Sequence, residues 1–117
     1  MATHAFVLLV RPQLGREDEW VQWHRGHARE VLKVPGFVAC KRFRIATSQP
    51  SGRESPWMFM IVYELETTDP INCIAELRRR AGTKTMPMSE ASDPSKTVSL
   101  LWEPMQDTST QPSARDT

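Results

Sequence analysis

The alternation of hydrophobic and polar positions divides the chain into four strand-like segments and two helical ones. The segment FVACKRFRI (residues 37–45) alternates with a period of two, which is typical of a β-strand. The segments AFVLLVR (5–11) and WMFMIVYELET (57–67) are apolar at odd and even positions alike over most of their length. The expected strands are residues 5–11, 37–45, 57–67 and 97–105.

A first helix is expected over residues 16–34. Its first turn carries three acidic side chains (residues 17–19), where the positive end of the helix dipole favours negative charge. The end is sharp, because Pro35 disfavours helical geometry at Val34 and Gly36 allows the chain to reverse.

A second helix is expected to start after Asp69, a candidate N-cap, with Pro70 at its first position, and to end at Gly82. The element order is then β-α-β-β-α-β. This order predicts the α+β class with a ferredoxin-like fold, in which two helices cover one face of a four-stranded antiparallel sheet.

The two strands that are apolar on both parities predict that both faces of the sheet are covered. A sheet with one solvated face would show alternation along each strand. The helices cover one face, and the simplest cover for the other is the sheet of a second copy. We therefore expect a homodimer, a dimeric α+β barrel, built from a single domain over residues 1–105. The tail over residues 106–117 has no large hydrophobic anchor and is expected to be disordered.

Charge and composition narrow the classes of partner. The formal net charge is +1, and the basic run at residues 78–80 fits the solvated face of a helix, so neither nucleic acid nor a membrane surface is expected as a partner. The sequence shows no signal peptide and no apolar run long enough to span a membrane, which favours a cytoplasmic protein. Cys40 and Cys73 have no metal-binding or disulfide spacing and are expected to be reduced thiols.

The first helix carries the residues that are the strongest candidates for catalysis or ligand binding. Trp20, His24, His27 and Val31 fall within one stripe of the helical wheel, and Trp23 flanks it. Spacing alone allows both histidines to be packing residues with hydrogen-bond partners. A metal site is not expected, because Glu30 lies far round the helix from His24 and no further His or Cys cluster completes a ligand set.

The motif W-x3-H-x2-E-V-L-x-V-P-G-F, which runs from Trp23 to Phe37, resembles the EthD-like branch of the dimeric α+β barrel superfamily. The segments KRF (41–43) and VYELET (62–67) add to the resemblance, which covers residues 5 to about 104. It implies a homodimer with a small-molecule pocket between sheet and helices in each subunit. Relatives include cofactor-free monooxygenases, lactone isomerases, polyketide cyclases and dehydratases, and haem-degrading enzymes. The resemblance also implies that His27 is the acid–base candidate.

Several other side chains are candidates for the same pocket. Trp20 and Trp23 would wall it and stack on a flat ring. His24 could lower the proton affinity of His27 by charge repulsion, or could be an exposed side chain without that effect. Tyr63 could donate a hydrogen bond to a substrate oxygen, or could be a packed ring with its hydroxyl at the rim. A loop acid, Glu90, could belong to a lid, although a solvated position is the simpler interpretation.

The roles of two arginines depend on which face of the second strand meets the pocket. Arg42 and Arg44 share one parity with Val38 and Cys40. If that face meets the pocket, Arg42 could stabilise an enolate and both could hold a carboxylate; at a solvated strand end they would only confer solubility.

Three hypotheses about function remain open at this stage. The first is a cofactor-independent enzyme that acts by general acid–base catalysis on an aromatic- or polyketide-derived molecule, of the isomerase, cyclase, dehydratase or monooxygenase type. The second is a non-catalytic small-molecule-binding accessory dimer, and the third is a structural dimer without a ligand. No glycine pattern supports a nucleotide cofactor, and haem is an alternative that would use the histidine as an axial ligand.

Overall fold

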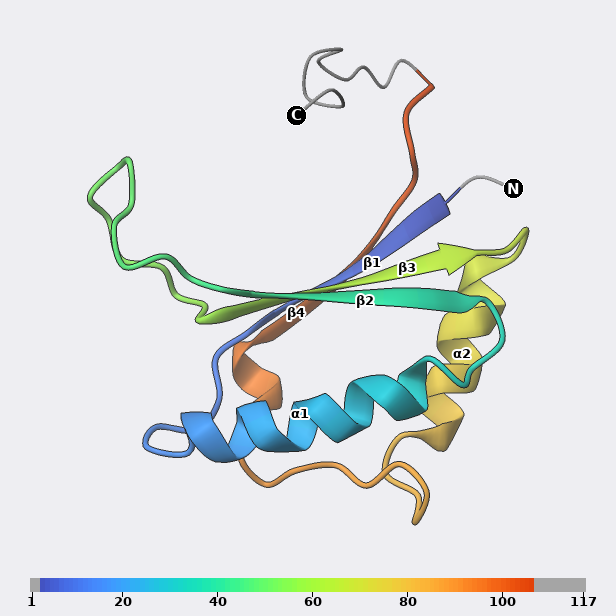
Figure 1. Cartoon of the computed structure of the whole chain (residues 1–117), viewed down its shortest axis with the longest axis horizontal. Coiled ribbons are helices and arrows are strands. Elements are labelled where there is room, and N and C mark those ends of the chain that lie inside the picture. Colours follow the sequence, from blue (N-terminus) through green and yellow to red (C-terminus); the bar gives the residue numbers. More distant parts are fainter. Residues whose placement is uncertain (1–2, 107–117) are drawn as a thin grey trace, which may run out of the picture.

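The computed structural model describes residues 3–106 of the chain. The elements follow the predicted β-α-β-β-α-β order, with one short 3-10 helix added before the last strand (Figure 1). They are β1 (Thr3–Val10), α1 (Glu17–Val31), β2 (Phe37–Arg44), β3 (Phe59–Glu66), α2 (Pro70–Arg80), η1 (Pro94–Lys96) and β4 (Thr97–Trp102). All but one residue of the tail predicted to be disordered lie outside the described residues.

The four strands form one antiparallel sheet in the order β2-β3-β1-β4. Both helices lie on the same side of this sheet (Figure 1). The predicted ferredoxin-like fold is therefore confirmed. Within residues 3–106, no helix is long and apolar enough to cross a membrane.

The turn between α1 and β2 explains why the first helix is shorter than expected. The helix ends at Val31, and the backbone amides of Val34 and Phe37 donate to the carbonyls of Val31 and Val34 at 2.9 and 3.1 Å. Gly36 adopts a φ of +99°, and a Cβ atom there would come within 2.6 Å of the Cys73 sulfur. A glycine is required at this position on both counts.

The start of α2 confirms the predicted cap. The Asp69 carboxylate accepts a hydrogen bond from the Asn72 amide at 3.1 Å, and Pro70 occupies the first helical position. The side chain satisfies one of the amides that a helix start leaves without an intrahelical partner.

The core lies between the helices and one face of the sheet. On β3 every second residue is buried, which places Phe59, Ile61, Tyr63 and Leu65 against the helices. Their partners on β1, such as Phe6 and Val10, face the same way. The apolar character of β3 on this parity is therefore explained by α1 and α2.

A β-bulge changes the expected parity of β2. The sequence pattern placed Phe37 on the face opposite Cys40, but the pairing with β3 shifts register between Phe37 and Ala39. Phe37 is buried in the core, and Cys40, Arg42 and Arg44 pair with the helix-facing residues of β3. The extra residue of the bulge leaves Val38 exposed and puts Phe37 on the same face as Cys40.

The opposite face of the sheet is uncovered within one chain. Val7, Leu9, Met60 and Val62 lie there and are only partly buried. At the outer strands Phe43, Leu100 and Trp102 keep 47%, 49% and 54% of their surface exposed. These residues form the second apolar face of the sheet, the face that the sequence predicted to be covered by a second copy of the chain.

Candidate functional site

A cavity of about 340 Å³ lies between α1 and the sheet. Its walls are mostly apolar, and its lining residues include two histidines, two tryptophans and four residues with a hydroxyl group. The lining residues are Phe6, Leu8, Val10, Trp20, Trp23, His24, His27, Ile61, Tyr63, Leu77, Met88, Ser92, Pro94, Thr97 and Ser99. An apolar pocket with a few convergent polar groups is the usual form of a small-molecule site.

The aromatic side chains of α1 form a continuous stack along one wall. The ring of Trp20 lies between His24 and Phe59, with centroids 4.8 and 5.0 Å away and nearly parallel planes. One turn on, Trp23 stacks against His27 at 4.5 Å. The helical spacing of four residues brings each tryptophan over a histidine. This arrangement fixes both imidazole rings at the cavity wall.

His24 is almost completely buried at the cavity wall. Only 3% of its surface is exposed, and its Nε2 atom lies 3.1 Å from the Tyr63 hydroxyl. Burial, followed by the charges of Arg42 and His27, lowers the pKa of His24 to about 3. Burial and the nearby Cys40 hold the pKa of the Tyr63 hydroxyl well above its usual value. Both members of the pair are therefore uncharged near neutral pH.

His27 is half-buried and lines the same cavity. Burial lowers its pKa, so its imidazole too is neutral near pH 7. Its Nδ1 atom is buried and has no hydrogen-bond partner in the protein. The charge repulsion expected between the two histidines acts on His24, because the lowered pKa of His27 has burial as its cause.

The two arginines of β2 lie outside this cavity. The Arg42 guanidinium donates to the Val21 carbonyl at 3.1 Å, and Arg44 lies over the Phe59 ring at 5.7 Å. Together with Trp20 they line a separate cleft of about 190 Å³. The structure thus brings together His24, His27, Tyr63 and the two tryptophans, and leaves the two arginines on the other side of Trp20.

The connection from α2 to β4 (residues 81–96) supplies residues that the sequence analysis missed. It runs beside α1, where the Trp23 indole donates to the Pro87 carbonyl at 2.8 Å. Met88, Ser92 and Pro94 of this segment line the cavity. Glu90, the weak lid candidate, is exposed, and its backbone carbonyl accepts from Arg16. No periodicity marks such a segment, so its path could be seen only in the fold.

The cavity can hold a molecule, take up a proton and form hydrogen bonds, but it offers little to a haem or a metal. A haem carries two carboxylates, and the lining residues include no arginine or lysine to pair with them. The Nε2 atom of His24 is already engaged by Tyr63, which leaves His27, among the described residues that line the cavity, as the one histidine that could ligate a haem iron. Across residues 3–106, no three His, Cys, Asp or Glu side chains gather at a spacing that would hold a metal ion.

The fold defines a ferredoxin-like α+β protein, and comparison with solved structures confirms this fold. No family model matches the sequence, and no curated protein does so. An ethyl tert-butyl ether d (EthD) family protein from Bacillus halodurans superposes with a TM-score of 0.55 at 18% identity over 90% of this chain and 100% of that one. The likeness to the EthD-like branch that the sequence predicted is confirmed at the level of the fold.

Two further structures share the fold. A dimeric ferredoxin-like protein of unknown function from Jannaschia sp. superposes with a TM-score of 0.58 at 12% identity, over 86% of this chain and 98% of that one. The haem-degrader MhuD of Mycobacterium tuberculosis, solved with two haems in its active site, gives a TM-score of 0.61 at 15% identity over 91% and 99%. Identities this low show a shared fold only.

Proposed function

We propose that this protein is a small cofactor-independent enzyme that moves protons on a flat, aromatic- or polyketide-derived molecule bound in the cavity. The observation that carries the proposal is the pair of neutral imidazoles, stacked on tryptophans, beside a protonated tyrosine in an apolar cavity. An isomerase, cyclase or dehydratase would need these groups, and a monooxygenase that activates its substrate by deprotonation would need them too.

His27 is the proposed general base. Its buried Nδ1 atom has no protein partner, so the ring can accept a proton from an acidic C–H group when Nδ1 carries the lone pair. The pKa of His24 is too low for it to hold a proton near pH 7, which makes it a poor base. Positioned general bases contribute about 10²–10⁴-fold to a rate.

The His24–Tyr63 pair is proposed to stabilise the oxyanion that forms when the carbon loses its proton. In the tautomer with the proton on Nε2, His24 donates to the tyrosine oxygen. The hydroxyl proton of Tyr63, which has the Cys40 side chain as its protein partner, would turn from Cys40 to an oxygen of the bound molecule. Trp20 and Trp23 would stack on its ring and exclude water, which strengthens that hydrogen bond.

The test is solvent exchange on a simple flat ketone. In D2O, the wild type should accelerate loss of the acidic CH2 protons of 2-tetralone, followed by NMR, and the acceleration should saturate with ketone concentration. His27→Gln should lower it at least about 100-fold. His4→Gln is the matched control, because His4 does not line the cavity. Saturable binding of the ketone without any proton exchange would refute the proposed enzyme and favour the alternative, a non-catalytic binding dimer.

We also propose a homodimer in which the open faces of two sheets meet. The support is the exposed apolar surface of Phe43, Leu100 and Trp102, together with the dimeric ferredoxin-like neighbour. Light scattering should give a mass near twice 13.4 kDa. Leu100→Glu should give monomers, whereas Leu14→Glu, the same change at a position 94% exposed away from the sheet, should not. A monomeric wild type would contradict the proposal.

A further inference from the structure

The cavity provides no counter-charge for an ionised ligand. None of the described residues that line it is Asp, Glu, Lys or Arg. The charge of Arg42 acts on His24 and Tyr63, but its guanidinium donates to the Val21 carbonyl and lines a separate cleft, so it does not reach the cavity wall. An anion enclosed there would lose its hydration without gaining an ion pair, which is costly in an apolar site. The walls therefore favour a molecule without charge on its buried part.

Ser92 provides a hydroxyl with no partner inside the protein. Its Oγ atom is completely buried and makes no hydrogen bond, although Ser92 lines the cavity. A buried hydroxyl without a partner destabilises a fold, unlike one that is paired. A bound molecule with a polar group at this point would satisfy it.

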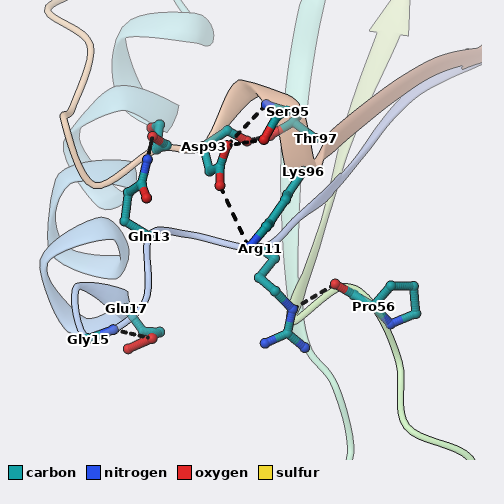
Figure 2. Close-up of polar contacts among 10 residues, drawn as sticks. Arg11, Gln13, Gly15, Glu17, Pro56, Asp93, Ser95, Lys96 and Thr97 are labelled. Atoms are coloured by element: carbon teal, nitrogen blue, oxygen red, sulfur yellow. Dashed lines mark hydrogen bonds and ion pairs between the residues drawn. The ribbon is translucent and has the colours of Figure 1, made fainter.

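The backbone around Ser92 is held in place by the turn that follows β1. The Gln13 amide donates to the Ala91 carbonyl at 2.8 Å, and the Gln13 side chain donates to the Ser92 carbonyl at 3.4 Å. On the other side, Asp93 caps η1 by accepting from both the amide and the hydroxyl of Ser95, as Figure 2 shows. The hydroxyl is thus presented from a fixed segment.

Ser92 and Tyr63 reach the cavity at different positions along β1, one beyond its end and the other near its middle. The segment that carries Ser92 is bonded to Gln13, beyond the end of the strand at Val10. Tyr63 lies opposite Phe6, four residues earlier, which is about 13 Å along an extended strand. A ligand that contacts both groups must carry polar atoms at its two ends.

We infer that the cavity takes an uncharged, flat molecule with two polar groups, one bound at His24, His27 and Tyr63 and the other bound by the Ser92 hydroxyl. This deepens the proposed function, because it rests on that cavity being the ligand site and names the class of ligand. Phenols, quinols and ketones with a second oxygen at the far end fit the description, whereas carboxylates and phosphates do not.

Calorimetric titration with three naphthalenes at pH 7 tests both parts of the inference. The probes are 2-naphthol, 2,6-dihydroxynaphthalene and 6-hydroxy-2-naphthoate, which differ only in the group at the far end. The diol should bind about three- to tenfold more tightly than 2-naphthol, as one extra neutral hydrogen bond predicts. The naphthoate should bind at least about tenfold more weakly than the diol.

Ser92→Ala should remove the advantage of the diol and leave the affinity for 2-naphthol within about twofold of wild type. Ser48→Ala, the same change on an exposed loop, should keep the advantage. A Ser92→Ala protein that retains the preference for the diol would overturn the role of Ser92. Naphthoate binding as tight as the diol would overturn the neutral-ligand class, and this comparison needs no variant.

These outcomes are separate from those of the exchange experiment. Equal binding of naphthoate and diol would refute the inference even if the wild type accelerates exchange on 2-tetralone. Absence of exchange would refute the enzyme even if the binding preferences appear as expected. If none of the three naphthalenes binds, the inferred ligand class is wrong.

Discussion

Acidification from pH 7 to pH 5 should destabilise the protein, and His24 should account for most of the loss. Its imidazole is 3% exposed and stacked against Trp20, with Nε2 engaged by Tyr63. The charged groups that bear on it, Arg42 and a protonated His27, are both cationic. Nothing around the ring therefore favours its protonated form.

The magnitude follows from the difference in proton affinity between the two states. Folding lowers the pKa of His24 from 6.5 to about 3, mainly through burial. Between these values the unfolded chain binds a proton that the folded protein does not, so the free energy of unfolding falls as the pH falls through this window. Proton linkage gives a loss of about 2 kcal/mol between pH 7 and pH 5. The lowered pKa of His27 adds to the loss with the same sign.

Urea unfolding at the two pH values, followed by tryptophan fluorescence, measures this loss. His24→Gln cannot take up the proton, so its free energy of unfolding should fall by about 2 kcal/mol less than that of the wild type over the same interval. Arg79 and Arg80 lower the pKa of Glu76, so this carboxylate loses its stabilising charge only at lower pH. Its contribution is the same in the wild type and the variant, and it cancels in the comparison. Equal losses in wild type and variant would refute the assignment to His24.

Three further predictions concern single contacts. Tyr63→Phe leaves Nε2 of the buried His24 without a partner and should lower the free energy of unfolding by about 1–3 kcal/mol in urea; an unchanged value would show that the hydrogen bond contributes nothing. Gly36→Ala should cost at least about 1–2 kcal/mol through its positive φ, and adding Cys73→Ala should restore only the part due to the sulfur contact; full restoration would refute the backbone argument. Trp23→Phe removes the bond to the Pro87 carbonyl and should speed tryptic cleavage at Lys84, read by mass spectrometry, whereas cleavage at Arg53 should keep its wild-type rate.

The sequence predicted the elements well because their local signals agree with the fold. The alternating and apolar runs gave four strands, and the cap at Asp69 is confirmed. The alternation predicted for β2 holds from Ala39 to Arg44, but Phe37 departs from it because a bulge adds one residue. Nothing in the pattern of Phe37 and Val38 distinguishes a bulge from a regular strand. Such irregularities are set by tertiary packing.

The candidate site was harder to predict, because its geometry depends on contacts between elements. Helical spacing placed Trp20 and His24 on one face, as the structure has them. The hydrogen bond between His24 and Tyr63 forms only if α1 packs on the sheet with His24 beside Tyr63 of β3. The spacing of residues along either element does not determine that alignment. The same holds for Ser92, which reaches the cavity only because its segment runs back along α1.

The residues proposed for proton transfer and the residues of the opposite cavity wall lie on separate parts of the chain. The groups proposed for chemistry belong to α1 and β3, which are tied into the helix and the sheet ladder. Met88, Ser92 and Pro94 belong to an irregular connection whose hydrogen bonds to its neighbours are mainly through the backbone. Replacing this connection with one of another sequence would change the shape and polarity of one cavity wall. The groups proposed for proton transfer and the sheet would stay as they are. The fold is thus suited to grafting, in which one scaffold accepts new ligands by exchange of a single surface segment.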